Sequence, residues 1–151
     1  MQTLLDATGW RADAEQTAAA DLIPAATITR EIARHLRGRD EEAAIRDLTE
    51  AIGRLLNFAR SGGTIPQWAI ERPKPTGDRT WDTFIATAFA YALERAGQRP
   101  LEWMTDVPPL AHETVPGDDP SPEFRAWLRA RTPEIFRAKN ILSRQADWEI
   151  A

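Results

Sequence analysis

Residues 40–60 read DEEAAIRDLTEAIGRLLNFAR, and this stretch decides the fold class. Its apolar side chains recur at spacings of three, four and seven, which places them on one face of an α-helix. Asp40 is a suitable N-cap residue, and Ser61-Gly62-Gly63 ends the periodic pattern. We therefore predict an amphipathic helix from Asp40 to about Arg60. Its apolar stripe consists of Ile45, Leu48, Ile52, Leu55, Leu56 and Ala59.

The sequence on either side of this stretch predicts further helices. Upstream, Ile28, Ile32 and Leu36 repeat every four residues, which indicates a helix over about 25–37. The short connection to the next helix makes the two an antiparallel pair. An Ala-rich helix is expected over 12–22. Downstream we predict a helix over about 79–96 at the centre of the core, with one face formed by Trp81, Phe84, Ile85, Ala88, Phe89 and Ala92.

The chain beyond residue 99 differs from this helical part in composition and charge. Residues 100–122 hold six of the eleven prolines, and between Pro100 and Phe124 there are six acids and no Lys or Arg. From Arg125 to Arg144 there are six bases and one acid. We predict one all-α domain over 1–151, built as a small helical bundle (1–99), a Pro-rich acidic strap (100–122) and a basic, Trp-bearing helical tail (123–151).

The strap and the tail have different local patterns. The prolines of the strap favour irregular backbone, which at this length is either pinned to the surface or mobile. Ser121 is a suitable N-cap for a tail helix, and Thr132-Pro133-Glu134 is a second cap signal. A short amphipathic piece is expected to start at Ile141 and end at Trp148.

Several functional classes lack the residues that they require. There is no Cys for disulfides or thiolate chemistry, and two histidines give little support to a His-rich metal site. Glycine-rich phosphate loops and a Gly-x-Ser-x-Gly elbow are also missing. No apolar run approaches the length of a membrane span, and the N-terminal sequence does not have the pattern of a secretory signal. We therefore expect a cytoplasmic protein that needs no cofactor or metal and has no membrane partner.

Asp78 and Asp82 form a carboxylate pair at the start of a predicted helix. Four residues apart, they lie on one helix face, where two carboxylates bind a metal or share a proton in some proteins. Further ligands do not lie nearby in sequence. The simpler interpretation is that Thr76, Asp78 and Asp82 cap the helix and stabilise its first turn.

Arg30 and His35 offer one catalytic alternative. An Arg and a His separated by four residues on one helix resemble the ribonuclease signature of HEPN domains, which are small all-α domains. That resemblance implies that His35 acts on the 2′-hydroxyl or the leaving oxygen, that Arg30 holds the phosphate, and that the protein dimerises. Because arginine is abundant here, such a pair arises readily by chance, and a solvated basic helix end is the simpler interpretation.

The basic tail offers two binding alternatives. Arginines interleaved with aromatic side chains bind phosphates and stack on bases, which would suit a nucleic-acid partner. The acidic strap beside the tail and the net charge of −4 instead favour neutralisation within the molecule. Trp and Arg also predominate in protein-interface hot spots. The residues that we predict to bind a partner protein are Trp103, Phe124, Trp127, Arg131, Phe136, Ile141 and Trp148.

Three segments resemble a set of small helical proteins common in high-GC bacteria. They are Thr76-Gly-Asp-Arg-Thr-Trp-Asp-Thr-Phe-Ile-Ala-Thr87, Arg99-Pro-Leu-Glu-Trp103 and Arg131-Thr-Pro-Glu-Ile-Phe-Arg-Ala-Lys-Asn-Ile-Leu-Ser143. Such proteins occur behind helix-turn-helix modules or beside genes for nucleotidyltransferase-like toxins. The resemblance implies a non-enzymatic, antitoxin-like or regulatory protein that binds a toxin-type partner. The oligomeric state stays open.

Overall fold

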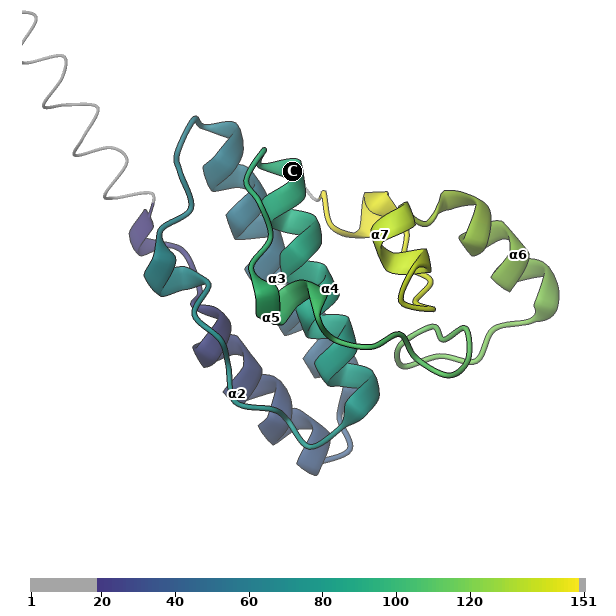
Figure 1. Cartoon of the computed structure of the whole chain (residues 1–151). Coiled ribbons are helices and arrows are strands. Elements are labelled where there is room, and N and C mark those ends of the chain that lie inside the picture. Colours follow the sequence, from purple (N-terminus) through teal and green to yellow (C-terminus); the bar gives the residue numbers. More distant parts are fainter. Residues whose placement is uncertain (1–18, 150–151) are drawn as a thin grey trace, which may run out of the picture.

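The computed structural model describes residues 19–149, and the regular structure in this part of the chain is helical apart from two isolated β-bridges. The all-α prediction is therefore confirmed. The helices are α2 (Ala25–Arg37), α3 (Glu41–Arg60), α4 (Arg79–Arg95), α5 (Glu102–Thr105), α6 (Pro122–Arg131) and α7 (Glu134–Arg137), with 3₁₀ turns at η1 (Gln67–Ala69) and η2 (Gln145–Asp147). In Figure 1, α2, α3 and α4 run alongside one another, and α6 and α7 lie to one side of them.

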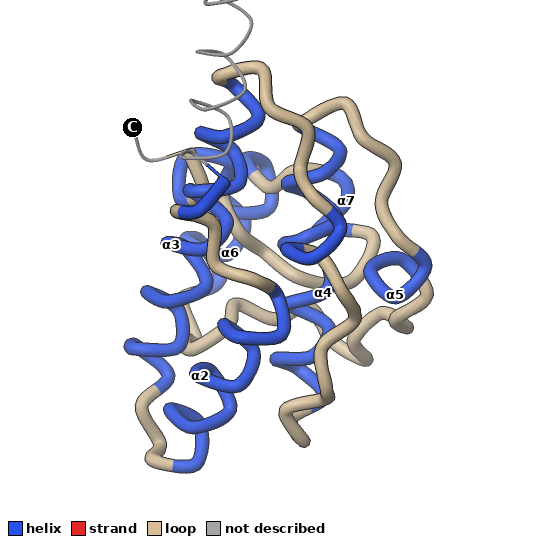
Figure 2. Tube along the Cα trace, turned by 90° about the vertical axis from the view of Figure 1, so that its left-hand side faces the viewer, coloured by secondary structure: helices blue, strands red, loops and turns tan. Residues whose placement is uncertain are grey.

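Helices α2 and α3 form the antiparallel pair that the sequence predicts, and Figure 2 shows them side by side. The connection is tight because Arg39 adopts a left-handed backbone conformation with φ 58°. Asp40 then caps α3, since its carboxylate accepts a hydrogen bond from the Ala43 N–H at 3.1 Å. The centres of both apolar stripes are buried, with Ile32 and Leu48 fully inaccessible to solvent. Leu36, Ile45 and Ala59, at the ends of the stripes, are half-buried.

Helix α4 is the central helix of the molecule. Every residue from Thr83 to Leu93 is buried, because α3, α5 and α7 all pack against this helix. Its start is capped as expected: the Asp78 carboxylate accepts from the Trp81 N–H at 3.1 Å. Asp82 accepts from the backbone N–H and the hydroxyl of Thr76 at 2.8 and 2.7 Å. Both carboxylates of the Asp78–Asp82 pair therefore stabilise the helix start.

The strap is pinned to the tail. Its one regular element is the single helical turn α5, which the sequence did not predict. Lys139 of the tail donates to the carbonyls of Thr105 and Val107, and the Asn140 amide donates to the Leu110 carbonyl at 2.6 Å. These bonds satisfy strap carbonyls that a Pro-rich backbone leaves without partners. The strap was predicted to be either pinned to the surface or mobile, and these hydrogen bonds show that it is pinned.

The tail completes the core. Phe136 and Trp148 stack with ring centroids 5.5 Å apart, and Phe84 of α4 meets both rings edge-on. Ile141 is fully buried and forms a β-bridge with Thr114 of the strap. The amphipathic piece expected from Ile141 to Trp148 has two halves of different structure. Extended backbone in the first half reaches both the strap and the core, and only η2 is helical.

Within residues 19–149, no helix combines the length and apolar character needed to cross a membrane. Most of the helix expected over 12–22 lies outside the described residues.

Candidate protein-binding surface

Helix α6 presents the largest exposed aromatic surface of the tail. It begins at Pro122, which fits the first helical position, and the Ser121 hydroxyl accepts from the Phe124 N–H at 3.2 Å. Leu128 is buried on one face of α6. Phe124 and Trp127 are both exposed. They lie on the same side of α6 because they are three residues apart.

Four side chains, three of them from this helix, form an ordered stack. The rings of Phe124 and Trp127 lie 5.4 Å apart and nearly parallel, with 15° between their planes. The Arg131 guanidinium lies 4.2 Å from the Trp127 ring centroid, and Arg144 lies 5.2 Å from it. Cations at this distance are attracted by the indole face. We call Phe124, Trp127, Arg131 and Arg144 the α6 surface.

The remaining bases of α6 are held by the strap. Arg129 makes a two-pronged pair with Glu113 at 2.6 and 2.7 Å. Arg125 donates to the Glu113 carbonyl at 2.8 Å and to the Asp119 carboxylate at 3.1 Å. The acidic strap therefore neutralises two of the six bases of the tail. These contacts fix the orientation of α6.

The Arg129–Glu113 pair changes the titration of both groups. The hydrogen bonds from Arg129 lower the pKa of Glu113 and outweigh the opposing effect of partial burial. The same bonds raise the pKa of Arg129. Both groups are therefore charged at neutral pH, and the pair is present under ordinary solution conditions.

Only part of the predicted partner-binding set is accessible. Phe124, Trp127 and Arg131 are exposed and lie together on the α6 surface. Phe136, Ile141 and Trp148 are at most 2% exposed, so they stabilise the core and cannot contact a partner in this structure. The sequence pattern does not distinguish the two groups, because each consists of aromatic and aliphatic residues in helical or Pro-flanked segments.

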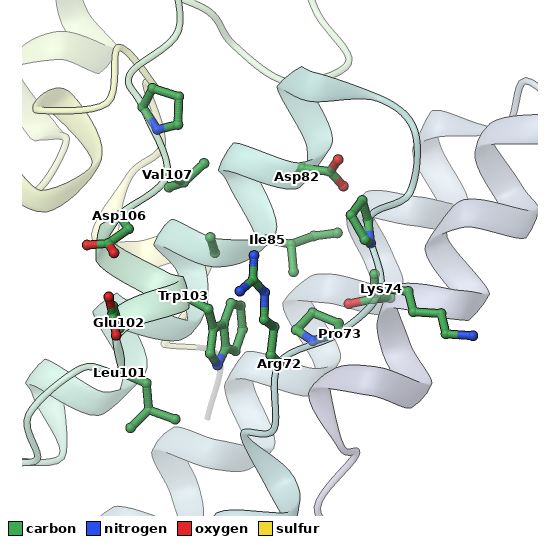
Figure 3. Close-up of a pocket in the computed structure, with 14 residues that line it drawn as sticks. Arg72, Pro73, Lys74, Asp82, Ile85, Leu101, Glu102, Trp103, Asp106 and Val107 are labelled. Atoms are coloured by element: carbon green, nitrogen blue, oxygen red, sulfur yellow. The ribbon is translucent and has the colours of Figure 1, made fainter.

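Trp103 lies at a separate site, beside a pocket of about 630 Å³. Its indole N–H donates to the Ile70 carbonyl at 3.0 Å, and its ring packs against Phe89. In Figure 3 the Arg72 side chain extends across this pocket beside Trp103, and Lys74 points away. Glu102, Asp106 and Asp82 also line the pocket, so its charge is mixed. The set of groups does not form a recognisable catalytic arrangement.

Arg30 and His35 are not brought together. Five residues apart on α2, their side chains are separated by about 140° around the helix axis. Arg30 is exposed, whereas His35 is half-buried and bonded to Asp47 of α3, with Nε2 and Oδ2 2.8 Å apart. The geometry gives no support to a joint ribonuclease site within one chain.

Two contacts at the candidate sites join residues whose proximity the sequence does not predict. Arg144 reaches Trp127 from a loop that follows α7, and Asp47 reaches His35 from the neighbouring helix. Helical spacing gives a signal for Arg131 beside Trp127 but none for Arg144, which depends on how the tail folds back. Comparisons of the chain with protein-family models, with curated proteins and with solved structures gave no match.

Proposed function

We propose that this chain is a non-catalytic binding domain and that its partner is a protein that docks on the α6 surface. The observation that carries the proposal is the exposed stack of Phe124 and Trp127 with Arg131 and Arg144 against it. Phe124 is 46% exposed and Trp127 is 37% exposed. The part of these two rings that stays in water forgoes burial free energy, which a partner recovers on binding.

The composition and rigidity of this surface suit a protein interface. Trp and Arg are enriched among the residues that contribute most to protein–protein affinity. Stacking and the two guanidinium contacts restrict the Trp127 side chain before binding, which lowers the entropy lost on association. The strap contacts of Arg125 and Arg129 hold the backbone of α6 in place. A partner therefore meets a preformed site.

The charge distribution favours a protein over a nucleic acid. Within the described residues, four of the six tail bases pair with carboxylates: Arg125 with Asp119, Arg129 with Glu113, Arg137 with Glu134 and Arg144 with Asp147. Nucleic-acid affinity depends on bases that are available to phosphates. Most of the positive charge of the tail is instead balanced within the molecule.

The partner class in this proposal is a toxin-type protein. The resemblance to antitoxin-like helical proteins favours a nucleotidyltransferase-like toxin, which the chain would neutralise by covering a functional surface. An antitoxin acts by binding and needs no catalytic group of its own. The proposal therefore agrees with a site built from aromatic and guanidinium groups rather than from paired acids and bases.

The test is a point substitution rather than removal of the tail, because the tail also completes the core. Tagged wild-type and Trp127→Ala proteins are used to recover partners from the native host, and any protein retained only by the wild type is purified for calorimetry. We expect Trp127→Ala to weaken binding at least about 30-fold, which corresponds to about 2 kcal/mol for a hot-spot residue.

Trp68 provides a matched control, since it is another exposed tryptophan, slightly more exposed than Trp127, and lies in η1 outside the α6 surface. Trp68→Ala is expected to change the affinity less than twofold. Unchanged binding by Trp127→Ala, or an equal loss in both variants, would contradict the proposal. Steeply salt-dependent binding of single-stranded RNA, lost in Trp127→Ala, would instead identify a nucleic-acid partner.

A further inference from the structure

Glu31, His35 and Asp47 bring one imidazole and two carboxylates together between α2 and α3. The potential ligand atoms of these three residues all lie within 4.8 Å of one another, and all three side chains are half-buried. Glu31 and His35 are four residues apart on α2 and therefore lie on one face of that helix. Asp47 faces them from α3.

The surrounding backbone holds this cluster in place. The tight connection through Arg39 and the Asp40 cap fix how α3 starts relative to the end of α2. Buried apolar side chains on both helices set the distance between the helix axes. The three groups are therefore arranged by the packing of two rigid elements rather than by a mobile loop.

The distances suit a small divalent metal ion. Zinc binds imidazole nitrogen and carboxylate oxygen at about 2.0–2.2 Å, which separates neighbouring ligand atoms of a tetrahedral shell by about 3.3 Å. The His35 Nε2 and Asp47 Oδ2 atoms are 2.8 Å apart, slightly closer than this value. Small side-chain rotations would therefore admit an ion between them, and Glu31 is near enough to supply a third ligand.

We propose that Glu31, His35 and Asp47 form a binding site for a divalent transition-metal ion of the zinc type. Two carboxylates balance the charge of the dication, and the imidazole nitrogen favours zinc-type ions over magnesium and calcium. Three protein ligands leave the fourth tetrahedral position for water or for a group from another molecule. The site is distinct from the α6 surface and does not depend on the proposed partner.

Binding of the ion replaces two existing interactions, the His35–Asp47 hydrogen bond and the Arg34–Glu31 ion pair. An ionised carboxylate only accepts hydrogen bonds, so Nε2 of His35 carries a hydrogen that it donates to Asp47. The metal takes the place of this hydrogen on Nε2, and a neutral imidazole then carries its proton on Nδ1. Arg34, which pairs with Glu31, moves into solvent. This pair is weak because the Arg34 side chain is 65% exposed.

The experiment is a titration of the purified, chelator-treated protein with Zn²⁺ by calorimetry, and with Co²⁺ by visible absorption. We expect one ion per chain, a rise in Tm with Zn²⁺, and Co²⁺ bands that Zn²⁺ displaces. His35→Ala and Asp47→Asn should each weaken binding at least tenfold. His112→Ala is the matched control, because it removes the other histidine, which is exposed in the strap, and it should leave binding unchanged.

Glu31→Gln provides a variant that disturbs no core contact, since it keeps the size of a half-buried surface side chain. It should fold as the wild type does, by circular dichroism without metal, and bind Zn²⁺ more weakly. Absence of saturable binding by the wild type would overturn the proposal. Binding that His35→Ala retains, or that His112→Ala removes, would also overturn it.

Discussion

The tail contains two stacked aromatic pairs with nearly the same geometry and opposite surroundings. Phe136 and Trp148 have centroids 5.5 Å apart and planes 5° apart, and both rings are buried. Phe124 and Trp127 have centroids 5.4 Å apart and planes 15° apart, and both rings are exposed. Stacking geometry alone therefore does not tell a structural pair from a binding pair.

The neighbours of each pair decide its role. Phe84 of α4 packs edge-on against both buried rings, so that pair joins the tail to the central helix. The exposed pair has guanidinium groups against its indole instead of apolar cover. Cations keep the site hydrated and soluble while leaving ring surface for a partner. Substitutions in the two pairs should therefore affect different properties.

The largest expected effect comes from breaking the buried pair. Trp148→Ala should reduce the free energy of unfolding by about 3–5 kcal/mol, because it leaves a cavity against Phe84 and Phe136. Urea denaturation followed by circular dichroism measures this loss. Trp68→Ala serves as the exposed control and should change stability by less than about 0.5 kcal/mol. Equal stability of the Trp148 variant and the wild type would mean that the tail does not complete the core.

A smaller loss is expected where the strap approaches α3 at Gly117. This glycine has φ 76°, and a Cβ atom would lie 2.7 Å from the Ile45 Cδ1 atom. Gly117→Ala should cost about 1–3 kcal/mol through the left-handed backbone and the close contact. Gly77→Ala isolates the backbone part, because Gly77 has φ 94° and open space around it. Thermal unfolding should show the greater loss for Gly117→Ala; the reverse order would mean that the strap packs loosely.

The ion pair that orients the exposed aromatic surface should contribute less to stability than either of these packed contacts, because it is partly solvated. Arg129 lowers the pKa of Glu113, so this contribution is present at neutral pH and is lost as the pH falls through the lowered pKa. Denaturation of the wild type and of Glu113→Gln across pH 2–7 tests the predicted direction of this pH dependence. The two curves should differ at pH 7 and converge at the acid end. A constant difference would show that titration of Glu113 is not the cause.

The smallest effect on stability is expected from the exposed pair itself. Trp127→Ala should change the free energy of unfolding by less than about 0.5 kcal/mol, although it removes as large a ring as Trp148→Ala does. The same denaturation measurement checks this value. A loss above about 2 kcal/mol would make Trp127 a structural residue and would remove the basis of the proposed α6 surface.

The sequence predicted the elements that depend on local periodicity. The stripe from Ile45 to Ala59 predicts α3, and the caps at Asp40 and Asp78 place the starts of α3 and α4. Such features depend on contacts within a few residues, so local patterns suffice to find them. The predicted alternatives for the strap also included the pinned arrangement that the structure shows.

The sequence did not separate the exposed side chains of the tail from the buried ones. Burial of Trp148 depends on Phe84, which lies in a different helix far along the chain, and on the extended backbone at Ile141. The Arg144–Trp127 contact likewise requires the chain to fold back after α7. Periodicity contains no information on such distant pairings. Only the structure therefore identifies which residues form the binding surface.

The burial of Phe136 and Trp148 has a consequence for how the chain is made. A ribosome synthesises α2, α3 and α4 first, and the surface of α4 against which these two rings pack stays bare until residue 148 has emerged. Translation products that stop within the strap expose apolar surface, which makes them targets for chaperones and proteases. Cellular quality control would therefore favour chains that have been synthesised at least as far as Trp148.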